Sequence, residues 1–262
     1  MSIRTKYVSD IKILNVFPDV YTEDLKKTKE NRKKFSENLK EQTNKLVELE
    51  TVFVDKGSAS IEDAFDEAVN APYILQKVKT GKKEGYDAVV IDCFGDPGLD
   101  AARELVDIPV IGANHSACFL ATQLGARFSI INILKEVEPL VRNLLMKYGL
   151  YNRVASMRVI NVPVLDLEKE PEKNAKKVPE TVKKTVLEDG AYSVVFGCTG
   201  MAFLLGEVRK VLAEEEGIDV PIIEPLKAAV YNAVYWVLYG TSHSKLEFPP
   251  PREKKRLLDF EI

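Results

Sequence analysis

The feature of this sequence that most constrains its fold is an internal repeat. Three short segments of the first half recur in the second half, in the same order. The pairs are residues 13–16 (ILNV) with 130–133 (IINI), 86–93 (YDAVVIDC) with 192–198 (YSVVFGC), and 107–111 (DIPVI) with 219–223 (DVPII). Three matches in one order predict two similar halves, related by a pseudo-twofold axis.

Short β-branched runs alternate with longer segments of helical period, which predicts an α/β protein with parallel sheets. The expected strands are residues 11–17, 51–54, 88–91, 110–111, 128–133, 158–164, 193–196 and 222–223. The expected helices are residues 22–47, 61–80, 117–124, 136–148, 179–188, 202–215 and 226–239. The charge-dense residues 26–40 and 169–184 are interpreted as solvated helix faces.

The repeat predicts two α/β domains, each a mainly parallel sheet flanked by helices, with the active site in the cleft between them. The first domain is expected to comprise residues 1–112 plus 225–262, and the second residues 113–224. A chain of 262 residues with 45% hydrophobic content is long and apolar enough to bury both cores.

Charge and hydropathy narrow the class of partner. Lysine and arginine number 37 against 40 aspartate and glutamate, so no strong field favours nucleic acid or an anionic membrane, and a small-molecule substrate is expected. The apolar run at residues 11–17 is too short for a signal segment, and no run is long enough to cross a membrane. We therefore expect a cytoplasmic protein.

The three cysteines are candidates for different roles. Their odd number and wide spacing in a chain without an export signal indicate reduced thiols rather than disulfides. Cys93 and Cys198 each end a repeated strand and begin a glycine-containing turn, so they are expected to face one cleft from opposite sides. Cys118 lies in a helical pattern and is expected to pack in the core.

Two opposed thiols suit the inversion of a stereocentre. One removes a proton as thiolate and the other returns a proton to the opposite face, with the roles exchanged for the other enantiomer. Turn amides and helix dipoles predict a thiol pKa below the free value of about 8.5. The two histidines, His115 and His243, give no metal-ligand spacing, and no dinucleotide or phosphate-loop motif is present, so no cofactor and no metal are expected.

These motifs resemble a known family. Residues 93–103 (CFGDPGLDAAR) are similar to the first cysteine motif of hydantoin and allantoin racemases, and residues 197–201 (GCTGM) to the second. The resemblance runs from about residue 11 to 239. It implies the aspartate/glutamate racemase superfamily, with Cys93 and Cys198 as the catalytic acid/base pair, no cofactor and a homo-oligomer.

The sequence departs from the family pattern at three places. Residues 15–19 (NVFPD) replace an Asn-Pro-Asn motif followed by Ser or Thr, which anchors substrate in the family. Asn114 and His115 replace a Gly-Glu pair, and Asn132 stands near a position where Thr is usual. The substrate is therefore left open among 5-substituted hydantoins, allantoin and amino-acid-like compounds.

Candidate substrate contacts flank the cysteines or stand at strand ends: Asn15, Phe94, Gly95, Asn132, Thr199, Gly200 and His115. Asn15 and Asn132 occupy matching strand ends, although Asn also forms ordinary turns. His115 begins a helix near a strand end, where it either contacts substrate or simply caps the helix. Thr199 offers a hydroxyl to the substrate or caps the following helix.

The residues favour a cofactor-independent racemase or epimerase that acts on a carbon acid next to a carbonyl. Two alternatives stay open. One is a decarboxylase, lyase or cis-trans isomerase of the same superfamily, acting on a small carboxylate, and the superfamily's arylmalonate decarboxylase keeps only one of the two cysteines. The other is an inactive small-molecule binding module, which the retention of both cysteines disfavours.

Overall fold

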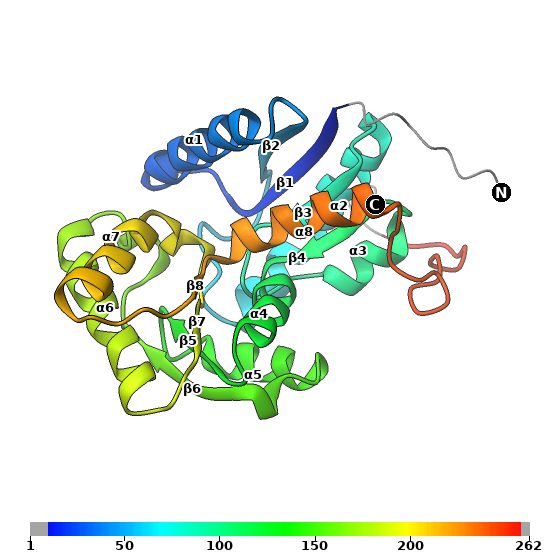
Figure 1. Ribbon diagram of the computed structural model, residues 1–262. Helices are drawn as coiled ribbons and strands as arrows, with labels where there is room; N and C mark the ends of the chain where they lie inside the picture. The colour runs from blue at the N-terminus through cyan, green and yellow to red at the C-terminus, as the bar shows by residue number, and fades with distance from the viewer. Residues whose placement is uncertain (1–9, 258–262) are drawn as a thin grey trace.

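The protein contains two four-stranded parallel sheets, seen in a computed structural model that describes residues 10–257 (Figure 1). The first sheet has the order β2-β1-β3-β4 and the second β6-β5-β7-β8. The strands are β1 (Ile11–Val20), β2 (Val47–Val54), β3 (Ala88–Ile91), β4 (Val110–Gly112), β5 (Phe128–Asn132), β6 (Val154–Val159), β7 (Ser193–Phe196) and β8 (Ile222–Ile223). The identical order confirms the two-sheet fold, because the repeats fall on β1 and β5, β3 and β7, and β4 and β8.

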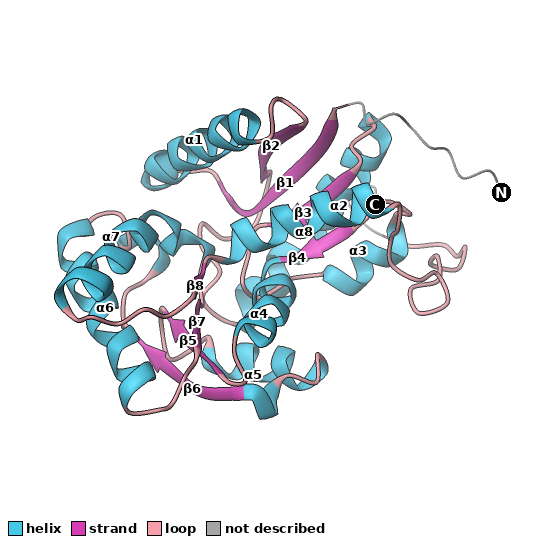
Figure 2. Cartoon of the chain, in the orientation of Figure 1, coloured by secondary structure: helices cyan, strands magenta, loops and turns pink. Residues whose placement is uncertain are grey.

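Helices cover both faces of both sheets (Figure 2). The α-helices are α1 (Lys26–Gln42), α2 (Ala64–Glu84), α3 (Leu99–Leu105), α4 (Ala113–Leu124), α5 (Glu138–Lys147), α6 (Pro171–Leu187), α7 (Leu205–Lys210) and α8 (Pro225–Tyr239). Short 3₁₀ helices lie at Glu23–Leu25, Tyr151–Arg153, Val164–Asp166 and Thr199–Leu204, and a π-helical turn follows α7 at Val211–Glu215. No helix within residues 10–257 is long and apolar enough to span a membrane.

The first sheet is buried on both sides at its centre, where β3 and β4 are buried at every position and β1 is buried along most of its length. Along β1, Ile13 packs with α1 and α8, whereas the next residue, Leu14, packs with α2 and α3. Successive strand residues point to opposite faces, so a strand covered twice reads as a continuous apolar run. Leu39 of α1 and Ile74 of α2 are 1% and 0% exposed at the two faces.

The second sheet repeats this arrangement. Ile130 of β5 packs with α4 and α5, while Ile131 packs with α6 and the α7 region. Cys118 is fully buried in the first of these clusters, which confirms the predicted core role. Helix α8 crosses back to the first sheet, where Leu226 and Ala229 join its core, and it also packs on α4 (Figure 1). The proposed domain boundaries at residues 112 and 224 stay a prediction.

Several predicted boundaries were wrong, and three show the size of the differences. The helix expected over residues 22–47 ends at Gln42, because Asn44 and Lys45 take positive φ angles of 48° and 65° and turn the chain into β2. Helix α6 begins at Pro171 rather than Pro179, so that the second proline lies inside the helix. The strand expected over residues 158–164 is β6, four residues earlier at its start.

Candidate active site

Both predicted cysteines lie at the carboxyl ends of equivalent central strands. Cys93 follows β3 and Cys198 follows β7, each after one intervening residue. Each sulfur accepts a hydrogen bond from the amide two residues ahead, at 3.4 Å from Gly95 N and 3.3 Å from Gly200 N. The two turns therefore have the same local geometry, and both thiols line one cavity between the halves.

The cavity lining combines apolar and carboxylic side chains. The second half supplies most of the apolar side chains, from β5, α5 and the segment before α6: Ile133, Val137, Leu140, Val141, Val164 and Leu167. Four carboxylic side chains complete the lining: Asp19, Glu67, Asp92 and Glu168. Phe94, Gly95, Thr199 and Gly200, all proposed as substrate contacts, line the same cavity.

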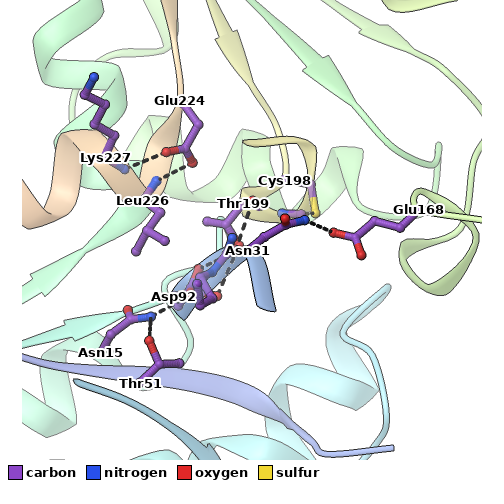
Figure 3. Close-up of polar contacts among 12 residues, drawn as sticks. Asn15, Asn31, Thr51, Asp92, Glu168, Cys198, Thr199, Glu224, Leu226 and Lys227 are labelled. Carbon is purple, nitrogen blue, oxygen red and sulfur yellow. Dashed lines mark hydrogen bonds and ion pairs between the residues drawn. The ribbon is translucent and has the colours of Figure 1, made fainter. Parts of the chain in front are cut away.

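Three other proposed contacts are not among the lining residues. Asn15 donates to Asp92 at 2.8 Å and to Thr51 at 3.2 Å, as Figure 3 shows. Asn132 is fully buried beside Gly197, and neither amide atom has a hydrogen-bond partner within residues 10–257. Asn132 ends β5 as predicted, whereas Asn15 lies inside β1, which continues to Val20.

His115 also lies outside the cavity lining. Its ring packs against Phe119 and Tyr148, with centroid distances of 4.6 and 4.8 Å. Burial, with the nearby cations Arg103 and Lys147, lowers its pKa to about 4. The side chain is therefore a neutral aromatic contact at neutral pH.

The expectation of a low thiol pKa was wrong. Burial raises the pKa of Cys198 to about 12 and that of Cys93 well above its ordinary value. The turn amides act in the predicted direction and lower both, but loss of hydration outweighs them. The surroundings differ, because Glu67 raises the pKa of Cys93 whereas Arg32 lowers that of Cys198.

A buried ion pair joins the two cysteine turns. Arg32 of α1 donates to Asp92 from Nε at 2.7 Å and from Nη2 at 3.1 Å, and Nη2 also donates to the carbonyl of Thr199 at 3.1 Å. The Thr199 hydroxyl donates to the Asp92 carbonyl at 3.3 Å. Figure 3 shows Asp92, Thr199 and Cys198 of this network. Asp92 precedes Cys93 and Thr199 follows Cys198, so the network fixes one cysteine relative to the other.

Sequence reasoning missed Arg32. It lies in the charge-dense segment that was interpreted as solvated, yet it is only 3% exposed. Its position gives a signal only in retrospect. Leu25 and Leu39 each lie seven residues, or about two turns, from Arg32, Thr28 lies four residues before it, and all three are buried.

Asp96 holds the turn that contains Cys93. Its carboxylate accepts from the amides of Asn114 at 3.0 Å and His115 at 2.9 Å, which caps the start of α4. The Tyr148 hydroxyl donates to the same carboxylate at 2.8 Å. Asp96 takes a positive φ of 47°, and burial raises its pKa to about 6 in spite of these donors.

Asp19 and Glu67 were not identified from sequence as site residues. Burial raises the pKa of Asp19 to about 8 and that of Glu67 to about 7. Glu67 lies against Gly95, where a Cβ would stand 1.9 Å from its Oε1. Within residues 10–257, no group of three or more His, Cys, Asp and Glu side chains is placed to hold a metal ion.

A parallel α/β fold of two similar halves, with two cysteines in the cavity between them, is the architecture of an isomerase family. The chain belongs to the Asp/Glu/Hydantoin racemase family, whose model matches residues 28–233.

Curated relatives and a solved structure agree with this assignment. The chain is 39% identical over 199 residues to a hydantoin racemase from Pseudomonas sp. (strain NS671), covering 76% of this chain and 78% of the relative. It is 38% identical over 204 residues to that of Paenarthrobacter aurescens, covering 77% and 84%. The allantoin racemase from Klebsiella pneumoniae superposes with a TM-score of 0.84 at 32% identity, over 96% of this chain and 98% of that one. The chain is thus an enzyme of the isomerase class.

Proposed function

We propose that this protein is a cofactor-independent racemase or epimerase of 5-substituted hydantoins, including allantoin, that transfers protons between Cys93 and Cys198. The observation that carries the proposal is the placement of both thiols at equivalent strand ends on one cavity. The substrate class is supported by the relatives, which are named as hydantoin and allantoin racemases.

The proposed reaction removes one proton from the substrate carbon and returns one proton to its opposite face. A thiolate on one side removes the proton from the carbon next to the carbonyl, and the electron pair moves onto the carbonyl oxygen as an enolate. The opposite thiol then protonates that carbon from the other face, which inverts the centre and leaves this second sulfur as the thiolate. The next turnover in the reverse direction starts from that state.

The cavity supports a substrate with a polar ring and an apolar substituent. Carboxyl groups and the turn amides of Gly95 and Gly200 could bind a ring with N–H and C=O groups. Val137, Leu140 and Val141 add an apolar surface to the same cavity. Such a surface favours a hydrocarbon substituent on the ring carbon.

Proton NMR in deuterium oxide tests this function directly. Wild-type protein is incubated with single enantiomers of 5-substituted hydantoins and allantoin, and the ring-carbon proton signal is followed together with optical rotation. We expect loss of both signals without a change in mass beyond deuterium. Release of carbon dioxide from a malonate-type substrate, without exchange in any hydantoin, would instead support the lyase alternative.

Single cysteine variants test the two-base mechanism. Cys93→Ala and Cys198→Ala should both abolish racemisation, and each should retain proton exchange with at most one enantiomer, the one whose proton faces the remaining thiol. Cys118→Ala is the matched control, because this thiol is fully buried in a separate core cluster. Racemisation by either active-site variant at the wild-type rate would contradict the mechanism.

We also propose that the enzyme is a cytoplasmic homo-oligomer. The three cysteines are free thiols, a state that reducing compartments preserve. Exposed apolar side chains gather around a hollow between α4 and α8: Phe119, Leu120, Leu124, Tyr231 and Tyr235. Light scattering over a range of concentrations tests the assembly, and a monomer at all concentrations would contradict it.

A further inference from the structure

Asp19 occupies an unusual place at the end of β1. The regular pairing of β1 with β2 is interrupted between Phe17 and Val20, so Pro18 and Asp19 form a bulge. Bulges beside active sites redirect a side chain, and here Asp19 lines the cavity together with Cys93 and Cys198. The residue is 4% exposed.

The Asp19 carboxyl group lacks the partners that a buried carboxylate needs. Its Oδ1 has no hydrogen-bond partner among residues 10–257, and no ion pair to it is present in that part of the chain. The cation on this side of the cavity, Arg32, donates to Asp92 and Thr199 instead. A charged carboxylate in such a place would be costly, whereas the neutral acid is tolerated.

The charged groups that face Asp19 favour its neutral form. Asp92, Asp66 and Glu62 each add negative potential to the effect of burial, and together these raise its pKa to about 8. The other carboxyl groups on the cavity are Glu67 and Glu168. At neutral pH Asp19 is therefore mainly a carboxylic acid, with one O–H to donate and one oxygen to accept.

Ionisation of Asp19 would also oppose the proposed chemistry. A negative charge on this residue raises the pKa of both Cys93 and Cys198. It would likewise repel an enolate formed between them. The neutral acid imposes neither penalty, so the protonated state is the one compatible with catalysis at this site.

We propose that Asp19, as a neutral carboxylic acid, donates a hydrogen bond to the substrate carbonyl that becomes the enolate oxygen. When a thiolate removes the adjacent carbon-bound proton, the electron pair moves to this oxygen and the hydrogen bond strengthens, while the acid proton stays on Asp19. The carbonyl oxygen of the acid accepts from the ring N–H beside that carbonyl. A carboxylic acid is thus complementary to the cis-amide edge of a hydantoin. This role rests on the proposed racemase function.

Two substitutions distinguish a neutral donor from a charged carboxylate. Asp19→Ala removes the donor, and we expect kcat to fall by about 10²–10³-fold, the usual loss for one oxyanion donor. Asp19→Asn keeps a neutral N–H donor of similar shape, and we expect kcat within about tenfold of wild type on the same grounds. Equal, large losses in both variants would show a charged role, and wild-type activity in Asp19→Ala would show no role. Either result overturns the proposal.

The pH dependence of kcat adds a second readout. Wild-type activity should decline as pH rises through about 8, where Asp19 loses its proton. The Asp19→Asn variant should lack this decline, because an amide does not ionise. A decline that persists unchanged in the variant would overturn the assignment to Asp19.

Infrared spectroscopy tests the protonation state without any substrate. The difference between wild-type and Asp19→Asn spectra should contain the C=O band of a protonated carboxylic acid at neutral pH, and this band should disappear above about pH 8. Its absence at neutral pH overturns the proposal. If wild type exchanges no hydantoin proton but the band is present, the proposed substrate fails while the neutral acid stands, so the two failures are distinguishable.

Discussion

The buried ion pair between Arg32 and Asp92 gives the strongest test of how this site is held. The pair is bidentate, and its side chains are 4% and 0% exposed. Arg32→Met keeps most of the volume and removes the charge, which leaves Asp92 buried with Asn15 as its remaining side-chain donor. Removing one partner of such a pair costs about 3–5 kcal/mol. The Thr199 carbonyl also loses a donor, so we place the loss near the upper end of this range.

The assay is urea unfolding followed by circular dichroism at neutral pH. We expect the free energy of unfolding of Arg32→Met to fall by about 5 kcal/mol. Lys33→Met is the matched control, because the neighbouring side chain is 77% exposed and its ion pair to Glu37 spans 3.9 Å. The control should change stability by no more than about 0.5 kcal/mol. A loss below about 1 kcal/mol in Arg32→Met would refute the argument from desolvation.

A double-mutant cycle separates the pair from general disruption. Arg32→Met combined with Asp92→Asn removes both charges, so the double variant should lose less stability than the sum of the two single variants. We expect a coupling energy of about 2–3 kcal/mol. Strict additivity would show that the two side chains do not stabilise each other, whatever their distance.

Three further predictions concern packing and charge around the cysteines. Gly112→Ala should destabilise the fold by about 1–3 kcal/mol in urea unfolding, since the new Cβ would stand 2.5 Å from the Asp96 carboxyl carbon; an unchanged midpoint contradicts this. Glu67→Gln should speed alkylation of Cys93, followed by mass spectrometry, only above about pH 7, where Glu67 is charged and raises the thiol pKa; equal rates at all pH values contradict this. Ile74→Ala should lower the free energy of unfolding by about 2–5 kcal/mol because the side chain is fully buried. An unchanged midpoint of thermal unfolding would contradict this.

The sequence predicted the structure well wherever a pattern along the chain decides it. Buried parallel strands read as continuous apolar runs, so β3, β7 and β8 were predicted with their observed bounds. The repeat then placed Cys93 and Cys198 together, because equivalent strand ends meet at one cleft. Both inferences depend on periodicity and order alone.

The sequence was uninformative about features that depend on how the two halves pack together. The thiol pKa values depend on burial in a cavity that neither half forms alone, so local turn geometry gave the wrong sign for the net shift. Arg32 and Glu67 lie in helices with many other charges, which concealed from sequence reasoning that Arg32 is buried and that Glu67 lines the cavity. The segment of residues 15–19, which contains Asp19, did stand out because it departs from the family pattern. The side chain of Asp19 reaches the cavity through a bulge in β1, which the sequence did not predict.

The two halves differ in the contacts of one pair of equivalent residues, Asn15 and Asn132. In the first half Asn15 contacts Asp92, whereas in the second half the equivalent Asn132 faces Gly197. A Cβ on Gly197 would lie 2.4 Å from the Asn132 side chain, so no carboxylate fits there. Because the second half has no carboxylate at the position equivalent to Asp92, Arg32 forms its ion pair with Asp92 of the first half.

The contacts of Arg32 determine how a substrate can enter. The Arg32 contacts connect one cysteine turn to the other. A hinge motion that keeps these contacts would therefore open the cavity on another side. Two contacts on the rim also cross between the halves and are polar and less enclosed: Glu62 accepts from the Val164 amide at 2.7 Å, and Asn31 donates to Glu168 at 2.8 Å. Opening on that side would have to break these two hydrogen bonds, which join the first half to the segment between Val164 and Glu168. Entry would then leave the spacing of the two sulfurs unchanged.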